Sequence, residues 1–162
     1  MFALVTGRSV DEAWAELRKI RTNNERVKRI RKALRECSRR DDLKERVRHF
    51  VSAFKILTDN RNLLDHSNIF EITKEPISLY KYDRDGKTIH TVVTLEEPRK
   101  VADDMRRFYD YGVMLANSIG LEAAGSTLLP PASLVKPPLP RKLDYTPAPI
   151  ALSRTRKQRP RA

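Results

Sequence analysis

Proline is distributed very unevenly along this chain, and that limits how much of it can fold. Eight of the ten prolines lie from Pro130 onward. Between Ser126 and Ala162 there are also eight lysine or arginine residues against one acidic residue, Asp144, a net charge of +7. Such a segment buries too little apolar surface to offset the entropy of ordering it. The sequence therefore predicts a folded domain over residues 1–125 and a proline-rich, basic, disordered tail over residues 126–162.

The first part of the chain has the periodicity of amphipathic helices. Ser9 and Glu12 form a capping box, and apolar residues then recur at three- and four-residue steps. Thr58-Asp59-Asn60 supplies capping chemistry after the third helix. A second capping box at Thr94–Glu97 opens the strongest helix pattern. The expected buried positions are Ala13, Leu17, Ile20, Val27, Ile30, Leu34, Cys37, Leu43, Val47, Phe50, Val51, Phe54 and Leu57, and in the last helix Val101, Met105, Phe108, Gly112, Leu115 and Ile119.

Before the last helix the period changes to two. Residues 77–82 and 88–92 alternate between apolar and polar side chains, with Asp85-Gly86 between them. This pattern predicts a β-hairpin, and Ile69–Ile72 could add a third short strand. The expected fold is thus mainly α, with a small β-hairpin before the last long helix.

Composition excludes several classes of function. Cys37 is the only cysteine, and with three scattered histidines it gives no metal-ligand spacing. We therefore predict no metal and no cofactor. No apolar run approaches the ~20 residues of a membrane span, so a cytoplasmic protein is expected. The net charge of +12 favours a nucleic-acid partner, although basic residues can also serve only to solubilise exposed helix faces.

One short segment, Arg61-Asn62-Leu63-Leu64-Asp65-His66, has residues that could carry chemistry. On a helix, Asn62 and His66 share a face, as do Arg61 and Asp65. Arg61 and His66 point ~140° apart, so one helix does not bring them together. A structural interpretation is equally available: Arg61 pairs with Asp65, Asn62 caps a helix and His66 ends it.

The segment resembles the motif of the HEPN superfamily, an Arg, a polar residue that is often Asn, and a His a few residues later, near the start of a late helix. The resemblance covers roughly Ser9–Gly120 and implies an antiparallel helical bundle. It also implies a metal-independent RNA endonuclease of the toxin or defence type. Two copies would form a homodimer with a composite site, in which Arg61, Asn62 and His66 are catalytic and Asp65 supports them.

The chain departs from that pattern in two respects. A hairpin separates the motif from the last helix, as in only some members. Phe2–Gly7 also looks like the end of a helix whose beginning is missing, so the bundle is expected to be incomplete at its start.

Two other functions remain open from the sequence. The chain could be a catalytically silent HEPN-like module that binds protein or nucleotide, or a basic nucleic-acid-binding adaptor that acts through its tail. RNA is the expected ligand and an antitoxin or other protein a candidate partner. The residues expected to contact nucleic acid are Arg29, Lys32, Arg154, Arg156, Lys157 and Arg159.

Overall fold

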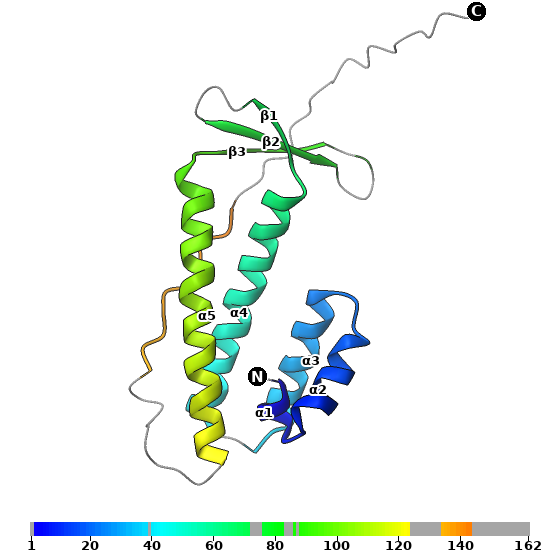
Figure 1. The fold of residues 1–162 in the computed structure, drawn as a ribbon, viewed down its shortest axis with the longest axis vertical. Coiled ribbons are helices and arrows are strands. Elements are labelled where there is room, and N and C mark those ends of the chain that lie inside the picture. The colour runs from blue at the N-terminus through cyan, green and yellow to red at the C-terminus, as the bar shows by residue number, and fades with distance from the viewer. Residues whose placement is uncertain are drawn as a thin grey trace, which may run out of the picture.

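The computed structural model describes residues 2–38, 40–71, 76–82, 86, 88–123 and 134–143. Two long helices dominate it, α4 (Asp41–Asp65) and α5 (Glu96–Ala123). Figure 1 shows them side by side and antiparallel, with a small sheet at one end and three shorter helices beside the other. None of the described helices is long and apolar enough to cross a bilayer. The predicted mainly α fold with a last long helix is confirmed.

The three short helices, α1 (Phe2–Thr6), α2 (Val10–Arg18) and α3 (Asn23–Glu36), form one corner. The capping box at the start of α2 is confirmed. The Ser9 Oγ accepts from the Glu12 N–H at 3.2 Å, and the Ser9 N–H donates to Glu12 Oε2 at 3.0 Å. The backbone hydrogen bond from Ser9 is the main cause that lowers the pKa of Glu12.

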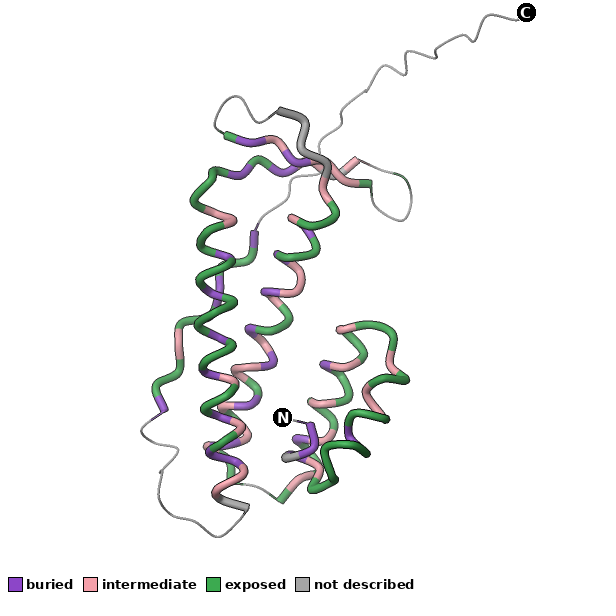
Figure 2. The backbone as a smooth tube through the Cα atoms, viewed as in Figure 1, coloured by how far each residue is buried: buried purple, intermediate pink, exposed green. Residues whose placement is uncertain are grey.

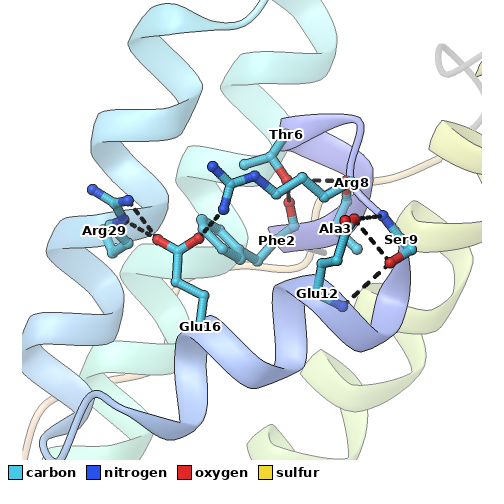
Figure 3. Close-up of polar contacts among 8 residues, drawn as sticks. All are labelled: Phe2, Ala3, Thr6, Arg8, Ser9, Glu12, Glu16 and Arg29. Carbon is cyan, nitrogen blue, oxygen red and sulfur yellow. Dashed lines mark hydrogen bonds and ion pairs between the residues drawn. The ribbon is translucent and has the colours of Figure 1, made fainter.

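A buried polar link joins this corner together. The Glu16 carboxylate on α2 pairs with Arg8 in the loop before α2, and with Arg29 on α3 (Figure 3). One acidic side chain thus ties two cations that would otherwise repel each other, and fixes α3 against α2.

The main core lies where α4 meets α5 and α3. Among its members, Leu34, Val47, Leu115 and Ile119 are at most 1% exposed. Two residues of the predicted apolar stripes do not belong to it, because Phe54 is 39% and Met105 41% exposed. The short helices cover only one half of the α4–α5 pair, so the same helix faces that are buried in one half are uncovered in the other (Figure 2).

The sheet contains β1 (Asn68–Glu71), β2 (Ile77–Tyr82) and β3 (Thr88–Val93) in the order β1-β2-β3, all antiparallel. The predicted hairpin is therefore present, with the third strand. Ile77, Leu79 and Val93 are buried and pack on Leu64 near the end of α4, as the period-two pattern requires. The Tyr80 ring stacks on His90 at 4.6 Å.

Ten residues of the tail depart from the prediction that residues 126–162 stay out of the core. Residues 134–143, here called the strap, run along α4 in an extended conformation without helix or strand. Leu134 and Leu143 are both 6% exposed and join apolar clusters of the body. The expectation for the tail on either side of the strap lies outside the described residues.

Candidate functional site

The Arg61–His66 segment forms the last turn of α4 and its C-cap. α4 runs unbroken through Thr58–Asn60, so the predicted helix cap there is wrong. The helix ends at Asp65, and the His66 N–H donates to the Asn62 carbonyl oxygen at 3.3 Å. The HEPN-like pattern places its motif near the start of a late helix, whereas here the motif ends the helix that precedes the sheet.

The polar side chains of this segment lie on the surface. The predicted pairing of Arg61 with Asp65 is present, with Nε and Oδ2 2.8 Å apart, and these side chains are 61% and 44% exposed. An exposed pair of this kind contributes at most about 1 kcal/mol to stability. Asn62 and His66 are exposed too, and neither side chain has a polar partner within the described part of the chain. All three predicted catalytic side chains are thus accessible to a ligand.

A single copy does not bring Arg61 and His66 together. The helix is regular through Asp65, so the two side chains project about 140° apart around its axis. No bond or ion pair joins them in the described residues. The proposed chemistry, which needs both groups at one phosphate, therefore requires a second copy or a bend of the helix end.

The polar residue of this region with a structural role is Asn60, which sequence reasoning treated as a cap. It is 2% exposed. Its Nδ2 donates to the Arg141 carbonyl oxygen and its Oδ1 accepts from the Leu143 N–H, both at 2.9 Å. A single buried amide thus holds the end of the strap through its main chain, as a paired strand would. The signal was available, because Asn60 falls in a stripe of inward positions four and three residues apart: His49, Ala53, Ile56, Asn60 and Leu63.

Other α4 side chains hold the start of the strap. Arg46 donates to the Leu134 carbonyl oxygen, and His49 Nε2 donates to the Pro137 carbonyl oxygen at 2.7 Å. Lys136 pairs with Glu45, and its hydrogen bond lowers the pKa of that carboxyl. The strap is therefore fixed along most of its length by main-chain contacts.

The residues predicted to bind nucleic acid divide into two groups. Arg29 is engaged by Glu16, and Lys32 lies 3.9 Å from Glu36. Neighbouring Lys28 and Arg35 are exposed and have no ion-pair partner among the described residues. They were missed, although their spacing on α3 marks one exposed face. The predicted tail residues Arg154, Arg156, Lys157 and Arg159 lie outside the described residues.

The charge of the chain is concentrated at its two ends. Residues 1–40 contain twelve lysines and arginines against five acidic residues, a net charge of +7. Because the segment from Ser126 also carries +7, residues 41–125, which include α4, the sheet and α5, carry a net charge of −2. A polyanion would therefore meet α2 and α3, or the tail, before it meets the motif.

Within the described residues, no group of three or more His, Cys, Asp or Glu side chains gathers as a metal site would. Comparison with protein-family models, with curated proteins and with solved structures gives no match to this chain. The class of protein that the structure defines is a small basic helical domain, in which a paired α4–α5 layer carries a three-stranded sheet at one end.

Proposed function

We propose that this protein is a metal-independent RNA endonuclease of HEPN type, with a composite site built from Arg61, Asn62 and His66 of two copies. The supporting observation is the division of labour at the end of α4. Asn60 and Leu63 are buried and serve the fold, whereas Arg61, Asn62 and His66 project to solvent. Three polar side chains that folding does not require are grouped on one helix turn.

The chemistry follows from these groups. The 2′-hydroxyl oxygen of a ribose attacks the adjacent phosphorus, and the bond from phosphorus to the 5′-oxygen of the next nucleotide breaks. An imidazole, which exchanges protons near neutral pH, accepts the hydroxyl proton as His66. The second copy's imidazole returns a proton to the leaving oxygen. Arg61 stabilises the charged phosphorane, and Asn62 orients the phosphate. The products carry 2′,3′-cyclic phosphate and 5′-hydroxyl ends.

The expected result is RNA cleavage that survives chelation. Purified chain incubated in EDTA with structured and unstructured RNAs should give fragments with 2′,3′-cyclic phosphate ends, since no metal takes part in the proposed step. His66→Ala is the control, because His66 is exposed and its loss leaves the fold intact. If no RNA is cut above the level of that control, the proposal fails and a silent binding module takes its place.

In this proposal the protein acts in the cytoplasm, where a lone cysteine stays reduced. A ribonuclease of the toxin type also needs restraint, so an antitoxin or other protein partner belongs to the proposal.

A second candidate function is a nucleic-acid-binding adaptor, and the exposed face of α3 favours it. Lys28, Arg31 and Arg35 recur at three- and four-residue steps on that face and are exposed. Replacing Lys28 and Arg35 by Glu should weaken RNA binding and lower the salt slope by about two, because two phosphate contacts are lost. Arg99→Glu with Lys100→Glu, the same charge change on α5, is the control for net charge. Equal weakening by both pairs would contradict an α3 interface.

A further inference from the structure

An apolar groove lies between α4 and α5 on the half of the pair that the short helices leave uncovered. Its volume is about 280 Å³, and its lining is almost wholly apolar. Three lining residues project outward: Phe54 and Met105, and Tyr109, which is 71% exposed. Large apolar side chains gathered on one exposed face mark an interaction surface. The remaining lining residues are Phe50, Leu57, Thr58 and Phe108.

The groove continues as a stripe along both helices. On α5 the uncharged residues Ala102, Met105, Tyr109, Gly112 and Ala116 follow one another at alternating steps of three and four. This stripe lies beside the buried one and has the same period, which is the period at which helices pack along their length. α5 therefore presents two packing faces, of which α4 and the strap take one.

We propose that a second copy of this chain docks on this face, so that the two α4–α5 pairs form an antiparallel four-helix bundle with a two-fold axis along the helices. The inference deepens the proposed function, because it names the surface through which the second copy joins. In the other half of the pair, α1 and α3 already pack on α4 and α5. The second copy plays the same part where they end (Figure 1).

The register of the two helices can be read from one close contact. A Cβ at Gly112 would lie 2.5 Å from Phe50 Cε2, so these two residues stand at the same level. Because α4 and α5 are antiparallel, a residue later on α4 matches one equally earlier on α5. Lys55 then stands level with Arg107.

Charge complementarity across the axis follows from that register. A two-fold axis along the helices leaves levels unchanged, so Asp110 comes within about one turn of Lys55 of the second copy. Arg106 comes equally near to Asp59 of the second copy. Arg106 and Asp110 are exposed and have no ion-pair partner among the described residues. Opposite charges therefore border the apolar stripe on its two free edges.

The same geometry bears on the motif. Arg61 and Asp65 continue the α4 stripe beyond Phe54 and Thr58 at steps of three and four. A two-fold axis along the bundle places both copies of this pair at the same end. Each Arg61 then faces an acidic side chain of its own copy and one of the second copy, and the two motifs lie at one end of one assembly.

Sedimentation equilibrium of the full-length chain tests the surface. The expected result is a monomer–dimer equilibrium. Tyr109→Lys puts a charge at the centre of the face and should raise the dimer Kd about thirty-fold or more, as at the centre of other interfaces. Tyr82→Lys is the matched control, because Tyr82 is also exposed, at 62%, but lies on β2. Circular dichroism should be unchanged in both variants.

Asp110→Lys and Lys55→Asp test the register. Each change alone should weaken the dimer, and the double variant should restore it, because the opposed charges are exchanged. A chain that stays monomeric at the highest concentration reached overturns the proposal, and so does a dimer that Tyr109→Lys and Tyr82→Lys affect equally. Assembly is measured here, not cleavage. A dimer that cuts no RNA leaves this surface standing and removes the ribonuclease, whereas a monomer that cuts RNA does the reverse.

Discussion

Ending the chain after Gly125 should lower its stability by about 3 kcal/mol and its Tm by about 10 °C. The truncation removes Leu134 and Leu143 from apolar clusters and leaves the Asn60 amide without the two main-chain partners that it has at 2.9 Å. Ordering the strap opposes this gain, but three of its ten residues are prolines, whose fixed φ lowers the entropy lost on docking. The net effect is therefore large for one short segment.

Thermal unfolding followed by circular dichroism measures this effect, and a second truncation controls it. A chain that ends after Leu143 keeps the strap and loses only residues 144–162, so its Tm should stay close to that of the full chain. Asn60→Ala in the full chain should reproduce part of the loss, about 2 kcal/mol, whereas Asn62→Ala, on the exposed side of the same helix, should cost almost nothing. Equal Tm values for both truncations would contradict a role for the strap.

Sequence reasoning misjudged the strap because it counted proline only as evidence against folded structure. Proline prevents helix and central strand, and the strap is neither. It is held instead through main-chain carbonyl oxygens of Leu134, Pro137 and Arg141, which carry no sequence signal of their own. The signal lay in the receiving helix, where Asn60 and His49 occupy inward positions of α4.

The helices and the sheet were predictable because each depends on local pattern. The capping box at Ser9 and the alternation over residues 77–82 specify their elements without reference to the rest of the chain. The exposure of Phe54 and Met105 was not predictable in this way. Their stripes have the correct period, and only the length of the short helices decides which part of each stripe is covered.

The candidate site was predictable in its residues but not in its setting. Spacing alone indicated that Arg61 pairs with Asp65 and points away from His66, and the structure has both features. The position of the motif at the end of α4 depended on the continuation of that helix through Thr58–Asn60. Asn60 is turned inward by the strap rather than toward a helix terminus, and no local pattern reports that.

Arg61→Ala should lower RNA cleavage at least about a hundred-fold, as the loss of one charge-stabilising group does in other enzymes. Asp65→Asn separates this role from the ion pair. It breaks the same 2.8 Å pair but leaves the guanidinium in place. If Arg61 serves the site, Asp65→Asn retains cleavage, and both variants lose at most about 1 kcal/mol of stability because the pair is exposed. If Arg61 serves only as a partner for Asp65, the two variants behave alike in every assay, which is the result expected of a silent module.

Mixing inactive variants then tests whether the site is composite. Arg61→Ala and His66→Ala are each expected to be inactive as homodimers. When the two are unfolded together and refolded, mixed dimers contain one intact Arg61 and one intact His66. The two side chains project about 140° apart within one helix, so a site within a single copy would still lack one of its groups in every chain. Cleavage that returns in the mixture, at a fraction of the wild-type rate, therefore requires the two groups to meet across the dimer. A mixture as inactive as its components, with mixed dimers shown by sedimentation of tagged chains, would contradict the composite site.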